Sequence, residues 1–472
     1  MRPTSIEQLI KAANGIALTG GSGSVTDVTT DSRAVVPGSL FVCIRGEKVD
    51  GHDYLGMALE KGAVAAFCEK LPAADVVRAW FEAGRTLIRV GSSEQALMDA
   101  AEEYLAGFDV LRVAVTGSVG KTTTKEMAAK ILESRYRTVK TEGNHNNNIG
   151  LPLTVFRVDE TTEAVVLEMG MDRPGEIRGL AKIGRPDIAL ITTVGTSHME
   201  RLGSREAICE EKCSIADFMT AADTLIINDD NDLLHAREYG GDYHLIRVGT
   251  DGETVRIANA RPCDGGNGTE FDLTADGETQ HFVLPVPGVH NAMNAALAAS
   301  AGLVAGISLK ESAKALAGLK DESGNRLSVR KAGAVSVIDD TYNASPESMK
   351  AAIDTLMLRG EGRKVAILGD MFELGDTEKE LHGMVGNYAG RMGVDALYAV
   401  GHNAMYLAAE YVQMRENAVC KYYETKEELI EALPELIRPG DTVLVKASRG
   451  MHLEAVVRAI EERTAEEEGT GR

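Results

Sequence analysis

The segment at residues 113–123 reads Val113-Ala-Val-Thr-Gly-Ser-Val-Gly-Lys-Thr-Thr123: an apolar strand, a glycine-containing turn and the start of a helix. Glycine lets backbone N–H groups face phosphate oxygens, and the N-terminus of a helix favours an anion. In such a loop Lys121 reaches the outer phosphates and Thr122 can hold Mg²⁺. The segment predicts a phosphate-binding loop formed by Gly117, Ser118, Val119, Gly120, Lys121, Thr122 and Thr123.

One position of this loop departs from the general P-loop pattern. That pattern places its first glycine five residues before the glycine of the Gly-Lys pair, and this chain has Val115 there. The alternative interpretation is a glycine turn that only caps a helix. Strand, turn, Gly-Lys-Thr and helix follow one another in the expected order, which favours the phosphate-binding interpretation.

Composition restricts the partners that this chain can have. At 472 residues it is long enough for about three domains, and 71 acidic against 50 basic residues give a formal net charge of −21. We expect no nucleic-acid partner, because the sequence has no block rich in Lys or Arg. We expect no membrane insertion either, because no run approaches the roughly 18 apolar residues that span a bilayer.

The first residues and the cysteines indicate a cytoplasmic protein. Residues 1–18 read as an amphipathic helix that contains Lys11, without the charge pattern of a secretory leader. The six cysteines are scattered and show no paired spacing. Cys209 and Cys213 could share a helix face, but we interpret them as buried free thiols rather than as a metal site.

Short β-rich runs alternate with helical patterns along most of the chain, which predicts an α/β protein with parallel sheets. The pattern divides into three blocks at residues 1–90, 91–318 and 319–472. The third block has a doubly wound pattern but no G-x-G-x-x-G after its first strand, so a dinucleotide cofactor is not expected. Its strands are predicted at residues 334–339, 364–368, 396–400 and 442–446.

The form Thr-Gly-Ser-x-Gly-Lys-Thr-Thr resembles the Mur ligase family, and further motifs in all three blocks agree. The resemblance implies a small N-terminal α/β domain that binds UDP, a central P-loop ATPase-like domain with a parallel sheet, and a C-terminal Rossmann-like doubly wound domain. It also implies an ATP-dependent ligase that forms amide bonds. The cofactors would be ATP, at the loop described above, and Mg²⁺.

Three motifs of the middle block resemble the family's substrate and metal loops. Glu142-Gly-Asn-His-Asn-Asn-Asn-Ile-Gly-Leu-Pro152 resembles a loop beside the substrate. Val165-Val-Leu-Glu-Met-Gly170 is a buried strand that ends in a carboxylate, where P-loop enzymes place a metal or water ligand. Thr193-Val-Gly-Thr-Ser-His-Met-Glu200 follows another apolar strand. The implied substrate contacts are Asn144, Asn146 and Asn147, and the implied Mg²⁺ ligands are Thr122, Glu168 and His198.

Taken alone, Glu168 would more often be a solvated strand-end residue and His198 an ordinary loop histidine. Ala207-Ile-Cys-Glu-Glu-Lys-Cys-Ser-Ile215 resembles the family's helix with a carbamylated lysine, which would make Lys212 a further metal ligand. An isolated lysine among glutamates would otherwise be read as a solvated helix face.

Three features later in the chain extend the implied nucleotide site. Pro287-Gly-Val-His-Asn-Ala-Met-Asn294 resembles the segment whose asparagine contacts the nucleotide, here Asn291. Arg326 resembles a linker arginine near the γ-phosphate. Asp339-Asp-Thr-Tyr-Asn-Ala-Ser-Pro346 follows a strand and could also form a turn and helix N-cap; both readings can hold together. The implied ATP contacts in it are Asp340, Tyr342 and Asn343.

The first block resembles the UDP-binding domain of the muramoyl peptide ligases through Asp31-Ser-Arg33 and Gly46-Glu-Lys-Val-Asp-Gly-His52. Ser32 can hydrogen-bond a uracil or a phosphate, and Arg33 is a bidentate phosphate donor in principle. Without the family, Asp-Ser-Arg would be read as a polar loop. The implied substrate contacts are Ser32, Arg33, Asp50 and His52.

Three third-block motifs resemble the branch of the family that joins D-alanyl-D-alanine to UDP-N-acetylmuramoyl-tripeptide. They are the loop Tyr342-Asn-Ala-Ser-Pro346, Ile367-Leu-Gly-Asp-Met-Phe-Glu-Leu-Gly375 and Val443-Leu-Val-Lys-Ala-Ser-Arg449. Departures from the branch pattern are modest and leave acceptor geometry open; they are Asn148, Ser345 and Ala447. We expect these two molecules as partners, an acyl-phosphate intermediate and a monomeric enzyme. The implied acceptor contacts are Lys446, Ser448 and Arg449.

Two alternatives remain. One is another amide ligase of the same fold: a ligase that adds a diamino acid to UDP-muramoyl-dipeptide, or an enzyme similar to folylpolyglutamate synthase. The first relative commonly shows Asp-Asn-Pro-Arg, which is absent here, and folate ligases lack a UDP-binding domain. The other alternative is a P-loop protein that uses nucleotide as a regulatory switch and makes no bond.

Overall fold

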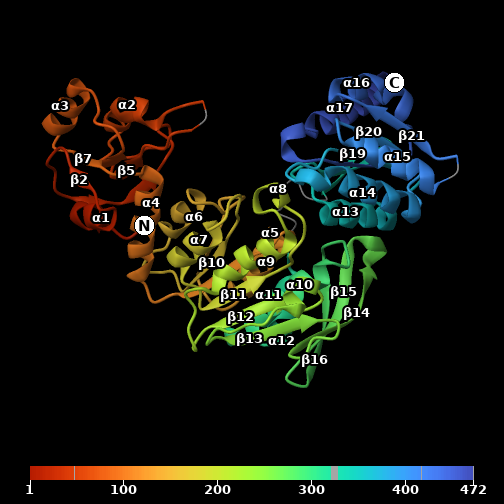
Figure 1. Ribbon diagram of the computed structural model, residues 1–472, viewed down its shortest axis with the longest axis horizontal. Helices are drawn as coiled ribbons and strands as arrows, with labels where there is room; N and C mark the ends of the chain where they lie inside the picture. The colour runs from red at the N-terminus through yellow and green to blue at the C-terminus, as the bar shows by residue number, and fades with distance from the viewer. Residues whose placement is uncertain (47, 320–327, 416, 471–472) are drawn as a thin grey trace.

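The structure, a computed structural model, describes residues 1–46, 48–319, 328–415 and 417–470. Figure 1 shows three lobes in an arc: the N-terminal lobe in red and orange, the central lobe in yellow and green, and the C-terminal lobe in blue. Each lobe is built around a β-sheet with helices packed on it. The predicted α/β class with three domains is therefore confirmed. None of the helices in the described part of the chain has the length and apolar character needed to cross a bilayer.

The N-terminal lobe contains a five-stranded sheet in the order β2-β7-β6-β5-β4. Its strands are parallel except β2, which pairs antiparallel with β7. Trp80 is fully buried and donates its indole N–H to Leu55 O, which ties α3 to α2. The elements are β1 (Thr4–Ser5), α1 (Ile6–Ala12), β2 (Ile16–Ala17), β3 (Ser24–Val25), β4 (Asp27–Thr29), β5 (Ser39–Val42), α2 (Leu55–Glu60), β6 (Ala65–Cys68), α3 (Ala74–Glu82) and β7 (Thr86–Arg89).

The prediction of one helix over residues 1–18 is wrong. Helix α1 spans only Ile6–Ala12, and short strands lie on both sides of it. Asn14 follows the helix with a left-handed φ of 46°, a conformation that ends helices. Gly15 packs so closely that an added Cβ would lie 2.5 Å from Ile88 Cγ2, and Ile16 then pairs with Arg89 of β7. Tertiary pairing with the sheet overrides the local helical pattern.

The central lobe is built on a nine-stranded sheet in the order β16-β15-β14-β13-β12-β11-β8-β10-β9. Strands β8 to β14 are all parallel to one another, as predicted. The antiparallel β15 and β16 extend the sheet at one edge. The strands are β8 (Leu111–Thr116), β9 (Thr138–Lys140), β10 (Ala164–Glu168), β11 (Ile188–Ile191), β12 (Thr224–Asn228), β13 (His244–Gly249), β14 (Val255–Cys263), β15 (Gly268–Ala275) and β16 (Glu278–Leu284).

Both faces of the central sheet are covered. Val113 and Val115 of β8 pack in the core beneath α5 and α11, whereas Ala114 packs in the core beneath α4, α6 and α7. A strand buried on both faces reads as a continuous apolar run, which is why β8 was recognisable. The helices are α4 (Ser93–Ala106), α5 (Lys121–Leu132), α6 (Gly150–Val155), α7 (Glu176–Gly184), α8 (Met199–Leu202), α9 (Arg205–Cys213), α10 (Asp232–Ala236), α11 (Asn291–Val304) and α12 (Leu309–Ala317).

The C-terminal lobe has a six-stranded sheet in the order β17-β18-β22-β19-β20-β21, parallel except for β17. Helices α13, α14 and α15 cover one face, and α16 and α17 cover the other, so the doubly wound prediction is confirmed. The elements are β17 (Ser328–Ala332), β18 (Val335–Asp340), α13 (Pro346–Arg359), β19 (Lys364–Gly369), α14 (Glu378–Met392), β20 (Ala396–Val400), α15 (Ala404–Met414), β21 (Val419–Tyr423), α16 (Lys426–Leu436), β22 (Thr442–Lys446) and α17 (Glu454–Thr470).

Candidate active site

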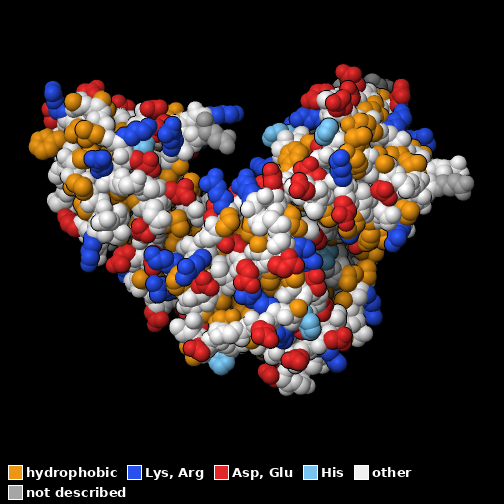
Figure 2. All heavy atoms as spheres, viewed as in Figure 1, with side chains coloured by type: hydrophobic (Ala, Val, Ile, Leu, Met, Phe, Trp, Pro, Cys, Tyr) orange, Lys and Arg blue, Asp and Glu red, His pale blue; other side chains and the backbone are white. Residues whose placement is uncertain are grey.

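A cleft of about 1000 Å³ lies between the central and C-terminal lobes. Loops at the carboxyl ends of β8, β10 and β11 form one wall, and loops after β18 and β22 form the other, as expected for ligand sites of open α/β sheets. Figure 2 shows the hollow between the outer lobes, with basic side chains gathered on its floor. The predicted site residues that line the cleft are Ser118, Val119, Gly120, Lys121, Thr122, Thr123, Asn144, Asn146, Asn147, Glu168, His198, Asp340, Tyr342, Asn343, Lys446 and Arg449.

Two glycines allow the loop after β8 to fold tightly onto its neighbours. Gly117 has a φ of 151°, and a Cβ there would lie 1.9 Å from Thr192 Oγ1. Gly120 has a φ of 89° and immediately precedes α5, and a Cβ there would lie 2.6 Å from Asn294 Oδ1. Lys121 Nζ folds back to donate to Gly117 O at 2.8 Å. The loop thus presents the N-terminus of a 12-residue helix and a lysine to the cleft, an arrangement suited to phosphate oxygens.

Glu168 ends β10 at the floor of the cleft and is 1% exposed. Its Oε1 accepts from Asn146 Nδ2 at 2.8 Å, and its backbone N–H donates to Thr141 Oγ1 at 3.0 Å. Its Oε2 is buried and has no hydrogen-bond partner among the described residues. A buried carboxylate oxygen without a donor is costly unless a cation satisfies it. Glu168, with Thr122 on the same cleft wall, therefore fits Mg²⁺.

Lys212 lies on α9 and is 2% exposed. Burial and the positive charge of Lys121 lower the pKa of Lys212 well below its usual value. Within the described part of the chain its Nζ forms no hydrogen bond or ion pair, and Lys212 does not line the cleft wall. The interpretation of Lys212 as a solvated helix residue is excluded by its burial. Cys209 and Cys213 of the same helix are buried free thiols, as predicted.

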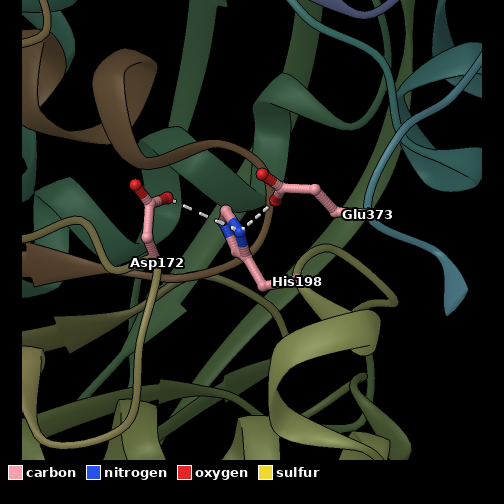
Figure 3. Close-up of side chains that lie close together, drawn as sticks. All are labelled: Asp172, His198 and Glu373. Atoms are coloured by element: carbon pink, nitrogen blue, oxygen red, sulfur yellow. Dashed lines mark hydrogen bonds and ion pairs between the residues drawn. The ribbon is translucent and has the colours of Figure 1, made fainter. Parts of the chain in front are cut away.

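His198 follows β11 and adopts a left-handed conformation with a φ of 67°, directly before α8. Figure 3 shows its ring between two carboxylates that come from different lobes. Its Nδ1 lies 2.6 Å from Glu373 Oε2 and 3.7 Å from Asp172 Oδ1. The hydrogen bond from His198 lowers the pKa of Glu373, so this carboxylate stays ionised. His198 is thus oriented by a residue of the C-terminal lobe.

The C-terminal wall of the cleft is held by a buried ion pair. Lys446 Nζ lies 2.6 Å from Asp340 Oδ2 and donates to Asn343 O at 2.7 Å, which joins the ends of β18 and β22. The Arg449 guanidinium lies over the Tyr342 ring, 5.1 Å from its centroid. Beyond this loop, Pro346 opens α13 and Ser345 forms a capping box with Ser348, so the predicted N-cap is present.

Several predicted site residues lie elsewhere. Asn291 is buried and donates to Pro287 O at 2.7 Å, so its neighbours His290 and Asn294 line the cleft in its place. Ser448 is also buried and accepts from the Phe372 N–H at 2.8 Å. Arg326 lies outside the described residues. Gly117 does not line the cleft, and its carbonyl oxygen accepts a hydrogen bond from Lys121 Nζ.

The four residues expected to bind UDP lie on the N-terminal lobe, apart from the cleft lining. Arg33 is exposed and pairs with Asp31 at 2.8 Å, and its hydrogen bonds lower the pKa of Asp31 to about 2. Hydrogen bonds from Lys70 and His52 hold the pKa of Asp50 below its usual range. Ser32 is buried beside this exposed pair. The sites on the two lobes are separate in this arrangement.

Comparison with known proteins agrees with this architecture. Three sequence profiles match the chain: the Mur ligase family catalytic domain at residues 24–105, the Mur ligase middle domain at 115–302, and the Mur ligase glutamate ligase domain at 325–449. A UDP-N-acetylmuramoyl-tripeptide–D-alanyl-D-alanine ligase of Bacillus subtilis is 39% identical over 444 residues, which cover 91% of this chain and 92% of the relative. This chain belongs to the Mur ligase family.

Two solved structures of this family resemble the whole chain. Crystal structure I of MurF from Acinetobacter baumannii has a TM-score of 0.87 at 29% identity and covers 98% of this chain and 99% of that one. MurF ligase from Thermotoga maritima in complex with ADP has a TM-score of 0.79 at 29% identity and covers 93% of this chain and 98% of that one. Both similarities extend over all three lobes of this Mur ligase.

The structure adds two acidic residues at the contact between the lobes that sequence reasoning did not select, and Glu347 also lines the cleft. Glu373 lies in the segment 367–375, which was noted for its resemblance but given no site residue. Glu347 of α13 accepts from the backbone N–H of Thr196 at 3.1 Å and from its hydroxyl at 3.2 Å. Both are acidic residues that follow strands of the C-terminal lobe and contact the central lobe. The sequence does show that each carboxylate follows a strand. It does not show the partner in the central lobe, which lies over 150 positions away in the chain.

Proposed function

We propose that this Mur ligase adds D-alanyl-D-alanine to UDP-N-acetylmuramoyl-tripeptide at the expense of ATP. The products are UDP-N-acetylmuramoyl-pentapeptide, ADP and phosphate, so the reaction belongs to peptidoglycan precursor synthesis. The observation that carries this conclusion is the cleft itself, in which the phosphate-binding loop of the central lobe faces the loops after β18 and β22 of the C-terminal lobe. The chain also matches a named D-alanyl-D-alanine ligase over 91% of its length.

The chemistry explains why the enzyme needs a phosphate site. A carboxylate is a poor electrophile, because its carbon already bears two negatively charged oxygens. Transfer of the γ-phosphoryl group to the tripeptide carboxylate gives an acyl phosphate, from which phosphate can leave. The amine of D-alanyl-D-alanine then attacks the acyl carbon. Because little covalent chemistry falls to the protein, its tasks are positioning and neutralisation of charge.

The residues of the cleft can be assigned to these tasks. Lys121 and the N–H groups of residues 117–123 bind and orient the phosphates, with Arg326 near the γ-phosphate and Asp340, Tyr342 and Asn343 on the nucleotide. Thr122, Glu168, His198 and Lys212 would hold Mg²⁺ directly or through its waters. When bound, Mg²⁺ supplies positive charge that offsets the charge on the transferred phosphoryl group. The orphaned Glu168 Oε2 supports this assignment.

Lys212 serves this site as a carbamate in our proposal. Its lowered pKa favours loss of one proton to give the neutral amine, which attacks CO₂ and releases a second proton, so that a charge of +1 becomes −1 overall. The new carboxylate-like oxygens suit Mg²⁺ or the waters around it. A buried ammonium beside Lys121 and a metal would instead add repulsion to a cationic site.

The long UDP-linked substrate would reach from the N-terminal lobe to the cleft. We assign Ser32, Arg33, Asp50 and His52 to its UDP end, and Asn144, Asn146 and Asn147 to the part near the reacting carboxylate. Lys446 and Arg449 are assigned to the acceptor side, with Ser448 behind them. We place the domain borders at residues 1–90, 91–318 and 319–472. We propose that the enzyme is a cytoplasmic monomer.

Phosphate release tests this function against a nucleotide-dependent switch. Purified protein with ATP and Mg²⁺ is given UDP-N-acetylmuramoyl-tripeptide, D-alanyl-D-alanine, or both. We expect sustained stoichiometric phosphate release only with both substrates. Release that is equally fast with ATP alone would overturn the ligase assignment and favour the switch.

A further inference from the structure

The loop that follows β19 carries the contact between the C-terminal lobe and His198. Besides the 2.6 Å contact between Glu373 Oε2 and His198 Nδ1, the backbone N–H of Glu200 donates to Glu373 O at 3.0 Å. A Cβ on Gly375 would lie 3.3 Å from Glu200 Cα, so the two backbones approach closely. The loop is therefore docked on the start of α8 through both side-chain and backbone atoms.

Both residues of the His198–Glu373 contact have unusual backbone conformations. Glu373 has a φ of 64° and His198 a φ of 67°, in the left-handed region that residues with a Cβ adopt at a cost. Such conformations persist where the surrounding contacts determine them. The side chain of Glu373 is 34% exposed and that of His198 20% exposed, so the contact is partly shielded from water. The meeting of these two side chains is thus built into the turns on both lobes.

The contact fixes the hydrogen on the histidine ring. A carboxylate oxygen accepts hydrogen bonds, so Nδ1 of His198 is the donor in this contact and Nε2 is the ring nitrogen left for a cation. Asp172 lies 3.7 Å from the same nitrogen, beyond hydrogen-bond distance, and its side chain is 64% exposed. Glu373 is therefore the acceptor that sets the tautomer. A histidine that binds a metal typically donates its other N–H to a carboxylate in this way.

We propose that Glu373 is a positioning residue that prepares His198 for Mg²⁺, so that binding of the cation depends on docking of the C-terminal lobe. This inference rests on the proposed role of His198 as a metal ligand. It differs from the roles assigned above, because Glu373 acts through His198. The C-terminal lobe thereby completes the metal site of the central lobe.

Two substitutions separate the hydrogen bond from the charge. Glu373→Ala removes the acceptor, whereas Glu373→Gln keeps one acceptor oxygen of the same reach, loses the negative charge and replaces the other oxygen with an NH₂ group. Glu380→Gln is the matched control, because Glu380 is an exposed acidic residue in the first turn of α14. Circular dichroism and thermal unfolding of each variant establish that the fold is retained.

The test measures Mn²⁺ binding in the presence of a non-hydrolysable ATP analogue by electron paramagnetic resonance, without either peptide substrate. We expect Glu373→Ala to weaken Mn²⁺ binding by about 10- to 100-fold, Glu373→Gln by less, and the Glu380→Gln control not at all. Nitrogen-15 spectra of the metal-free protein, with the His198 signal assigned from His198→Gln, should show the Nδ1–H tautomer in the parent and its loss in Glu373→Ala.

Each outcome of this test bears on one claim. Unchanged Mn²⁺ affinity and an unchanged tautomer in folded Glu373→Ala would overturn the positioning role. If His198→Gln itself binds Mn²⁺ normally, the metal role of His198 fails, and the inference fails with it. The ligase reaction is assayed separately with both substrates, so failure of the proposed function would be seen there and not in these binding measurements.

Discussion

The site residues on the central wall of the cleft are held in place by two different means. On the central lobe, Glu168 is fixed by Asn146 and Thr141, and Lys121 is anchored on Gly117, all within one domain. His198 is instead fixed by the C-terminal lobe through Glu373. The difference teaches that the phosphate-binding half of the site is preformed, whereas the ligand set for the cation is completed by contact between domains. The predictions below test each half in turn.

The largest effect is expected at the preformed half. Lys121→Ala should lower the ligation rate by about three powers of ten or more, because it removes a principal charge at the transferring phosphoryl group. The fold should be retained, since Lys121 is not part of a hydrophobic core. Steady-state rates and thermal unfolding together check this. Near-normal turnover by the folded variant would mean that the loop does not serve catalysis.

The next largest effect is expected at Lys212, the buried lysine of α9. Lys212→Ala should lose on the order of a hundredfold in rate, because the proposed carbamate no longer supports the cation. Acetate should restore part of the rate by occupying the vacated anionic position, and ethylamine should not. Full activity without any additive would show that no carbamate is needed.

A smaller effect is expected from the second contact between lobes. Glu347 accepts two hydrogen bonds from Thr196, and hydrogen bonds to a charged group are worth about 1.5–3 kcal/mol. Glu347→Ala should therefore lower kcat/KM by about tenfold and increase the separation of the lobes seen by small-angle scattering. Glu347→Gln retains an acceptor and should lose less. Equal scattering curves for parent and alanine variant would contradict a docking role for Glu347.

The smallest effect on stability is expected on the N-terminal lobe. Arg33→Ala breaks a fully exposed ion pair with Asp31, which should leave the free energy of unfolding almost unchanged because water screens such pairs. The KM for the UDP-linked substrate should rise several-fold, while kcat stays nearly the same. Urea unfolding and substrate titration measure the two quantities. A fall in kcat with an unchanged KM would place Arg33 outside the UDP site.

The sequence predicted those parts of the fold that leave a local pattern. β8 and its loop were found because a doubly buried strand and two glycines are visible in eleven residues. The edge strand β21 was missed because most of its side chains are exposed and give no apolar run. The antiparallel β15 and β16 were missed because no site motif lies within them.

The candidate site was predictable to the same extent. Glu168 and Lys121 belong to motifs whose chemistry depends on nearby residues. Glu373 and Glu347 were not selected, because their roles arise from packing between domains, which no spacing in the sequence records. Asn291 was selected on resemblance, yet its side chain is buried in local hydrogen bonds.

The central claim is that this cleft joins D-alanyl-D-alanine to a UDP-linked muramoyl tripeptide. The most direct test is mass detection of the product after incubation with ATP, Mg²⁺, this tripeptide and D-alanyl-D-alanine, with Lys121→Ala as the control. A parallel reaction supplies UDP-N-acetylmuramoyl-dipeptide and free diaminopimelate. We predict the pentapeptide product in the first reaction and at least about a thousandfold slower ligation in the second, because a wrong acceptor leaves buried polar groups unpaired. Efficient ligation of diaminopimelate, with no pentapeptide formed, would contradict the account.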